Sequence, residues 1–276
     1  AAMTAASTRA TDTDFELGDK VGLKVTMTAD GKDFVSNKPM TFDGTDFKAE
    51  GFLWYEDVNA TSTLFAYYPW QEGGDIPAEF SVKADQSGDN YTASDLIVAV
   101  KAGVKPTLSS TQMTFKHKMS RIVIDVTNES GFDITNIVIK GAVGTGVLDP
   151  ATGNFTAKAD AEASDLIANT ATANKVYYAL LVPQNGVKLM VTVTTADGKS
   201  GENRRMECNV QPADIELKFS GPITGWVDGD DLLPDGEGEV ETPTVEWGGV
   251  KYEIVTLKDG RTWMAENLRY VPEGKT

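Results

Sequence analysis

"MTFKHKMSRIVIDVTN", residues 113–128, is the stretch that decides the fold class of this chain. In its first half Phe115, His117 and Met119 alternate with polar residues, so they fall on one face of an extended chain. Its second half, Ile122 to Val126, is mostly β-branched, and such side chains suit a pleated sheet. The stretch therefore predicts strand structure rather than helix.

Strand-length runs of the same kind lie on both sides of this stretch, and no part of the chain has the apolar spacing of a long amphipathic helix. The runs are VGLKVTM (21–27), STLFAYYPW (62–70), SDLIVAV (94–100), ITNIVIKGA (134–142), KVYYALLVP (175–183), VKLMVTVTT (187–195) and ADIELKF (213–219). Turn signals such as Asp43-Gly44 and Asp197-Gly198 separate them. With around seven strands in each half, the pattern predicts an all-β chain of two tandem β-sandwiches, 15–108 and 109–226.

The two ends of the chain differ from this pattern. Residues 1–14 are small and polar, and we expect a flexible lead. Residues 227–242 carry seven carboxylates and no base, which predicts an extended acidic linker over 227–244. The alternative is a calcium loop, because Asp228, Asp230 and Asp231 cluster as oxygen donors, although their spacing lacks the usual calcium-loop pattern.

Charge and composition narrow the classes of partner. The chain of 276 residues has a net charge of −16, which disfavours nucleic acids and anionic lipid headgroups. No apolar run reaches the roughly 20 residues of a membrane span. The only cysteine, Cys208, cannot form an internal disulfide, and its alternating context predicts a small buried side chain.

No catalytic pattern is visible. His117 is the only histidine, so a His-rich zinc site is excluded, and we predict a packed, hydrogen-bonded side chain. The glycines of GAVGTG (141–146) precede a predicted hairpin instead of a phosphate-binding helix. Carboxylate pairs for glycoside hydrolysis stay open, since 41 acidic residues offer many combinations. We predict no enzyme activity, no cofactor and no metal.

Aromatic residues cluster between 54 and 70. Trp54, Tyr55, Tyr68 and Trp70 form a candidate ligand surface on which a sugar could stack, if these rings are exposed. Phe65 and Tyr67 fall on the opposite strand face. Core packing of the aromatic residues is the alternative.

Seven segments in order resemble the fimbrillin-like family, which comprises subunits and tip or accessory proteins of type V pili in Bacteroidales. They are FELGDKVGLKV (15–25), LFAYYPW (64–70), SDLIVA (94–99), MTFKHKMSRIVIDV (113–126), LDPATGNF (148–155), YYALLVPQ (177–184) and ITGWVDG (223–229). The resemblance covers roughly residues 12–229. It implies two transthyretin-like Greek-key sandwiches and export as a lipoprotein to the outer membrane surface. It also implies assembly with other pilin subunits by donor-strand exchange.

In that family an arginine-specific protease removes an amino-terminal strand and opens a groove for a strand of another subunit. Arg9 is the residue here that looks like the cleavage site, and the alternative is an ordinary surface arginine. The lipid-bearing cysteine of the family is not in this sequence. We therefore expect membrane contact only through an anchor on the precursor.

The segment VEWGGVKYEIVTLKDGRTWMAENLRY (245–270) resembles the start of the Fibrobacter major paralogous domain. Trp263, Met264, Asn267 and Leu268 supply its W-M-x-x-N-L core. Only about 30 residues follow the linker, so we expect a truncated third domain over 245–276.

A chain that continues past its second sandwich is poorly suited to donate a carboxy-terminal strand, which favours a tip or accessory position. The sequence thus predicts a non-enzymatic fimbrial subunit of the cell surface, acting in adhesion and pilus assembly, with a host or glycan ligand. The alternative is a surface glycan-binding lipoprotein.

Overall fold

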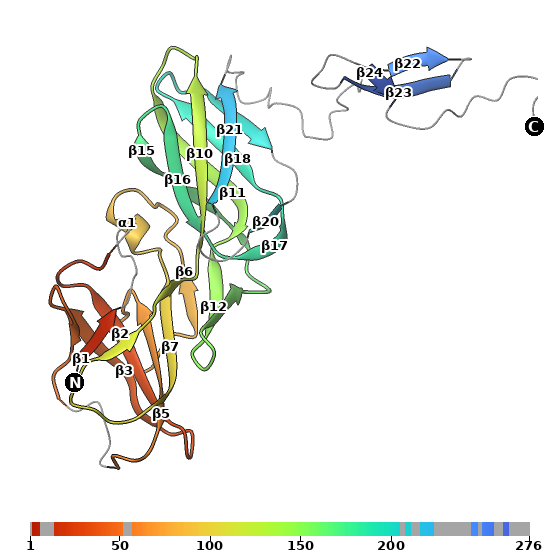
Figure 1. The fold of residues 1–276 in the computed structure, drawn as a ribbon. Helices are drawn as coiled ribbons and strands as arrows, with labels where there is room; N and C mark the ends of the chain where they lie inside the picture. Colours follow the sequence, from red (N-terminus) through yellow and green to blue (C-terminus); the bar gives the residue numbers. More distant parts are fainter. Residues whose placement is uncertain are drawn as a thin grey trace, which may run out of the picture. The chain divides into compact units, whose positions relative to one another are not determined.

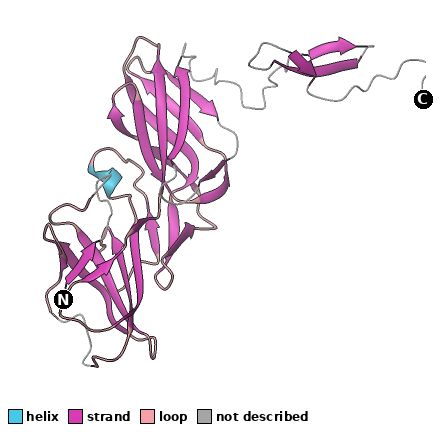
Figure 2. Cartoon of the chain, in the orientation of Figure 1, coloured by secondary structure: helices cyan, strands magenta, loops and turns pink. Residues whose placement is uncertain are grey.

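The computed structural model describes residues 2–5, 14–51, 57–204, 208–210, 216–223, 244–247, 250–256 and 262–264, with side chains over 14–51 and 57–201. Strands dominate this part of the chain, and α1 (Asp89–Thr92) is the only α-helix in it (Figure 2). The all-β prediction is confirmed. In the same residues no helix has the length and apolar character needed to cross a bilayer.

The chain divides into two compact units, Ala1–Asp230 and Asp231–Thr276. The first half of the first unit contains an eight-stranded sheet of order β8-β1-β4-β3-β2-β5-β7-β9. Figure 1 labels β1, β2, β3, β5 and β7 of this sheet. Its strands are β1 (Ala2–Ala5), β2 (Lys20–Met27), β3 (Asp33–Phe42), β4 (Phe47–Lys48), β5 (Ser62–Tyr68), β7 (Ile97–Val104), β8 (Thr111–Met113) and β9 (Lys116–His117). All neighbours are antiparallel except β1 and β8, which are parallel.

The second half of this unit contains two four-stranded sheets, β15-β16-β10-β21 and β14-β11-β18-β19, and a strand pair, β17-β20. The strands are β10 (Ser120–Asn128), β11 (Ile134–Val143), β14 (Ala163–Ile167), β15 (Asn169–Thr172), β16 (Val176–Leu181), β17 (Gln184–Val187), β18 (Met190–Thr195), β19 (Ser200–Arg204), β20 (Cys208–Val210) and β21 (Glu216–Ile223). β21 runs parallel to β10, from Arg121↔Glu216 to Asn128↔Ile223.

A shared sheet and a shared core join the two halves. β12 (Thr145–Asp149) pairs with its neighbour β13 (Asn154–Ala157) and, across the halves, with β6 (Glu79–Ser81). Phe65 and Tyr67 of β5 belong to the same buried cluster as Ile122 and Leu181. The boundary predicted at 108/109 falls just before β8, and β8 and β9 still pair within the first sheet.

Two glycine-containing segments show how local chemistry sets the connections. After GAVGTG the chain continues as strand β12, as predicted, and a Cβ on Gly141 would lie 2.1 Å from the Lys188 carbonyl oxygen. The sequence Gln184-Asn185-Gly186 predicts a hairpin turn, but this prediction is wrong, because these residues lie in β17, which pairs with β20 through an irregular register. Their partner strand is distant in sequence, so local turn propensity misleads here.

The second unit holds a three-stranded antiparallel sheet of β22 (Thr244–Trp247), β23 (Val250–Thr256) and β24 (Thr262–Met264). Trp263 pairs with Val255, and Met264 with Ile254. Asn267 and Leu268 lie outside the described residues, as does the acidic linker up to Thr244.

Candidate functional site

The candidate site is the position of β1 between β4 and β8, which we call the β1 slot. On one side Ala2 and Met3 pair with Lys48 and Phe47 of β4. On the other side Met3, Thr4 and Ala5 pair in parallel register with Thr111, Gln112 and Met113 of β8. β4 and β8 are not neighbours of each other, so β1 completes the sheet between them.

The strands that form the slot are short. β4 has 2 residues and pairs with β3 on its far side, whereas β8 has 3 residues and ends the sheet. Within the sheet, β8 is therefore held by β1. Withdrawal of β1 would leave backbone N–H and C=O groups of two strands without partners, which is the condition under which a sheet accepts another strand.

A cluster of aromatic rings lies behind the slot. Phe47 is 0% exposed and Met113 1% exposed, and both pair directly with β1. The Phe15 ring lies 4.9 Å from Phe47, edge to face, and 5.3 Å from Phe115. Such ring pairs stabilise beyond the area that they bury. Residues that register with β1 thus belong to the main apolar cluster of the first half.

Polar contacts stabilise the turn before β4 and join it to the residue before β8. The Asp43 carboxylate accepts N–H bonds from Thr45 and Asp46 at 3.0 and 2.9 Å and pairs with the Lys48 ammonium. These interactions, with the Asp46 amide first, lower the pKa of Asp43 to about 2. Across the slot Ser110, just before β8, donates its hydroxyl to the Asp46 carboxylate at 3.3 Å.

The predicted processing residue, Arg9, lies outside the described residues. In sequence it stands between Ala5, the last residue of β1, and Asp14, the next residue that the structure describes. A cut after Arg9 would separate β1 from the rest of the chain. The expectation of a flexible lead over 1–14 does not hold at Ala2–Ala5, because both edges of this segment pair with distant strands.

The predicted aromatic surface is not assembled from its described members. Tyr68 is 8% exposed, packs 5.6 Å from the Phe15 ring and donates its hydroxyl to Asp19. Burial, with the Asp19 carboxylate beside it, raises the pKa of Tyr68. The Tyr68 ring is therefore not available to stack on a sugar.

Trp70 belongs to a different cluster from Tyr68. It is half-buried against the shared core, and the Lys20 ammonium lies 5.6 Å from the centre of its ring. Trp54 and Tyr55 lie outside the described residues. Within β5 the predicted alternation is right, because Tyr68 lies opposite Phe65 and Tyr67; at Trp70, beyond the end of the strand, it is wrong, because Trp70 packs against the cluster of Phe65 and Tyr67. β5 is buried on both faces, because each face meets its own core.

His117 is packed and hydrogen-bonded, as predicted: its Nδ1 lies 2.7 Å from Asp95 Oδ2, and both side chains are largely buried. Within the part of the chain that the structure describes, no group of three or more His, Cys, Asp or Glu side chains is placed to hold a metal ion. The Cys208 side chain lies outside the described side chains.

Sequence reasoning missed β1 itself. Its four residues, Ala-Met-Thr-Ala, contain one β-branched side chain and are too few for a reliable alternation. The available signal was indirect, since a processing site at Arg9 requires a structural element before it.

Comparisons with known proteins agree with this architecture. The sequence model of the fimbrillin-like family matches residues 8–219. A curated protein of Bacteroides ovatus, named as fimbrium tip subunit Fim1C, is 33% identical over 91 residues. That match covers 32% of this chain and only 16% of the relative.

Two crystal structures share the fold. One, named as a cell adhesion protein of Bacteroides ovatus, has a TM-score of 0.62 at 18% identity and covers 80% of this chain and 91% of its own. The other, named as a cell adhesion protein of Bacteroides uniformis, has a TM-score of 0.63 at 19% identity, over 81% and 92%. With a family match that extends over most of its length, this chain belongs to the fimbrillin-like family.

Proposed function

We propose that this chain is a non-enzymatic fimbrial subunit of the cell surface that joins other subunits by exchange of the strand in the β1 slot. The observation that carries the proposal is the place of β1, a short strand between two strands that do not otherwise pair. Membership of the fimbrillin-like family supports the cell-surface setting.

The exchange has a simple physical basis. After a cut at Arg9, β1 would be held in the sheet by its backbone pairs with β4 and β8 and no longer by the chain. Once β1 leaves, Phe47 and Met113 lie beside unpaired backbone on β4 and β8. A strand from another subunit would satisfy both the backbone groups and the apolar side chains.

We place the subunit at the tip or in an accessory position. After β21 the chain continues into a second unit that forms its own sheet, so β21 is not a free terminal strand. The curated relative that is 33% identical over 91 residues is named as a tip subunit, which supports this placement. A sugar-binding role through Tyr68 is not part of the proposal, because that ring is buried.

Treatment of the full chain with an arginine-specific protease tests the proposal. We expect a discrete product that begins at Ala10 and takes up a labelled β1 peptide, as measured by fluorescence anisotropy. Arg9→Ala is the matched control, which should stay uncut at this position and take up no peptide. Equal uptake by Arg9→Ala would overturn the processing step.

A disulfide lock tests the exchange separately from the cleavage. Ala2 and Lys48 are register partners, so Ala2→Cys with Lys48→Cys, in a Cys208→Ser background, would tie β1 into its slot. We expect the oxidised, cleaved protein to exclude the labelled β1 peptide and the reduced protein to take it up. Uptake by the oxidised form would show that the slot is not the site of exchange.

A further inference from the structure

A hollow of about 620 Å³ lies at one end of the second half of the first unit. It is lined by the end of β10 (Asp125–Asn128), by the loop residues Gly131–Asp133 and by Asn174–Val176. We call it the loop hollow. Its volume is in the range of small-molecule sites, and it belongs to a different sheet from the β1 slot.

Two asparagines fix the walls of the loop hollow. The Asn128 Oδ1 accepts the Ser130 N–H and hydroxyl at 3.1 and 2.6 Å, and its Nδ2 donates to the Phe132 carbonyl at 2.7 Å. The Asn174 Oδ1 accepts the Ile134 N–H at 2.6 Å, and its Nδ2 donates to Asp133 at 2.8 Å. Both amides are therefore occupied in holding two loops together.

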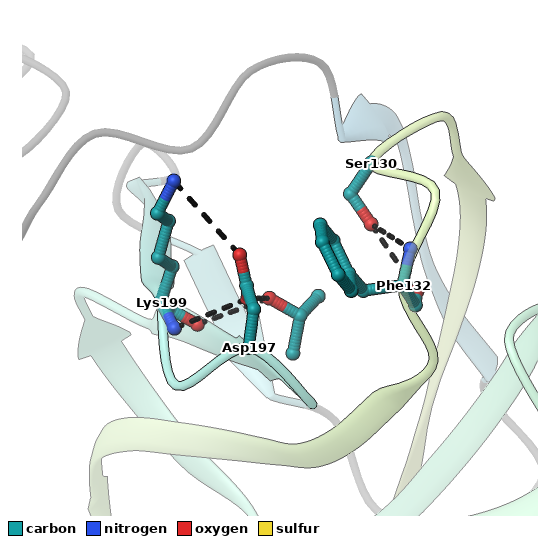
Figure 3. A network of polar contacts seen from close by, with 5 residues as sticks. Ser130, Phe132, Asp197 and Lys199 are labelled. Carbon is teal, nitrogen blue, oxygen red and sulfur yellow. Dashed lines mark hydrogen bonds and ion pairs between the residues drawn. The ribbon is translucent and has the colours of Figure 1, made fainter.

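Further contacts hold the loop that faces them. The Ala196 N–H donates to the Asp133 carbonyl at 2.8 Å, and Asp197 accepts the Thr195 hydroxyl at 2.7 Å. Figure 3 shows the Phe132 ring directed toward this loop, with Ser130 bonded to the Phe132 backbone behind it. The backbone that carries the Phe132 ring is therefore held in place by hydrogen bonds.

Several groups around the loop hollow are left free. The Phe132 side chain is 49% exposed, although its backbone N–H is hydrogen-bonded to the Ser130 hydroxyl. Asp125, Thr127 and Lys175 also line the hollow, and within the described part of the chain their side chains make no hydrogen bond or ion pair. Loops held by fully hydrogen-bonded amides, beside unpaired polar side chains and an exposed aromatic ring, are the features of a preorganised binding site.

The chemistry of these groups selects the ligand. An aromatic face packs against the C–H face of a pyranose ring, while a carboxylate, a hydroxyl and an ammonium bind its hydroxyl groups. The carboxylates Asp125 and Asp133 outnumber the single ammonium of Lys175, so an anionic ligand is disfavoured. We propose that the loop hollow binds an uncharged glycan, with Phe132 as the stacking residue and Asp125 and Lys175 as hydrogen-bonding residues.

A glycan microarray probed with the fluorescently labelled full chain tests this site. The array carries neutral oligosaccharides and sialylated or sulfated ones. We expect retention on at least one neutral glycan, at least a tenfold loss of signal in Phe132→Ala and a loss of several-fold in Asp125→Asn. Leu108→Ala is the matched control, because Leu108 is an exposed apolar side chain in the loop before β8, and its signal should be unchanged.

Three outcomes would overturn the proposal: retention on acidic glycans alone, no retention on any neutral glycan, or equal retention by Phe132→Ala and the parent chain. Circular dichroism on each variant separates lost binding from lost folding, and Asp125→Asn changes no packed side chain. The inference does not rest on strand exchange. Phe132→Ala should take up the β1 peptide normally after proteolysis, so failure of one proposal leaves the other intact.

Discussion

The β1 slot and the loop hollow are built in opposite ways. The slot is formed by backbone pairing along strands of 2 and 3 residues, beside a buried aromatic cluster. The loops that line the loop hollow are held by side-chain bonds of Asn128 and Asn174, and a backbone bond from Ala196 to Asp133 joins them to the loop that faces Phe132, whose side chain is 49% exposed.

The two constructions suit the two kinds of recognition proposed above. Backbone ladders are the same for every sequence, so a slot made of them can release one strand and accept another. Side-chain networks have one arrangement and hold a particular set of groups in place. Apolar burial should therefore dominate the energetics of the slot, whereas local polar geometry should dominate those of the hollow.

The largest expected contrast is between two Phe→Ala substitutions. Phe47→Ala removes a fully buried ring beside the slot and should lower the free energy of unfolding by about 3–5 kcal/mol. Phe132→Ala removes an exposed ring and should change it by less than about 0.5 kcal/mol. Urea denaturation followed by circular dichroism measures both. Similar losses for the two variants would contradict the distinction between the regions.

The next contrast concerns Asn174, which adopts a left-handed conformation with φ of 63°. Asn174→Ala should cost about 3 kcal/mol, because it adds backbone strain to the loss of two or more hydrogen bonds. Asn174→Gly keeps the conformation and loses only the bonds, so its cost should be about 1–2 kcal/mol lower. Urea denaturation again reports both values. Equal costs would show that backbone strain is not part of the role of Asn174.

Much of the fold was predictable from the sequence, because alternation is a local property. The pattern at 62–70 correctly places Phe65 and Tyr67 on the face opposite Tyr68. What alternation does not report is whether the second face is open or covered. Here it is covered, because β5 lies between two cores, and the predicted ligand surface loses Tyr68 for that reason.

The two sites themselves were harder to predict. Met3 pairs with Phe47 and Thr111, and register between such distant segments leaves no mark in a four-residue strand. The walls of the loop hollow depend on Asn128 and Asn174, which are 46 residues apart in the chain. Either asparagine alone is indistinguishable from an ordinary turn residue. Long-range pairing was thus the missing information in both cases.

A matched pair of Gly→Ala substitutions compares the two regions through a smaller loss of stability. Gly44, in the turn before β4, has φ of 95°, and Gly198, in the loop facing Phe132, has φ of 84°; neither has an atom within 4 Å of an added Cβ. Gly→Ala at each should therefore cost about 1–2 kcal/mol through backbone strain alone.

The functional effects of these two variants should differ. After cleavage, Gly44→Ala should take up a labelled β1 peptide faster than the parent chain, because β4 is held less firmly. Gly198→Ala should take it up at the parent rate. Fluorescence anisotropy measures the uptake, and faster uptake by Gly198→Ala would show that loosening is not confined to the slot.

The smallest expected effect is a dependence on acid pH. Asp43, in the turn before β4, has its pKa lowered from 3.8 to about 2, chiefly by the Asp46 amide and the Lys48 ammonium. A carboxylate with a lowered folded pKa stabilises the fold above its unfolded pKa, and this contribution disappears as the pH falls through the folded pKa. Uptake of the β1 peptide should therefore accelerate as the pH falls from about 4 to about 2.

Asp43→Asn tests the origin of that acceleration. An uncharged amide keeps much of the turn geometry but does not titrate, so the pH dependence of uptake should flatten in this window. Asp197→Asn is the control from the loop that the Phe132 ring faces, where the Thr195 hydroxyl and other contacts lower the pKa of Asp197. That variant should keep the parent pH dependence of uptake, since Asp197 does not contact the slot strands. If Asp197→Asn flattened the profile as much as Asp43→Asn, the acid effect would belong to the whole unit and not to the rim of the slot.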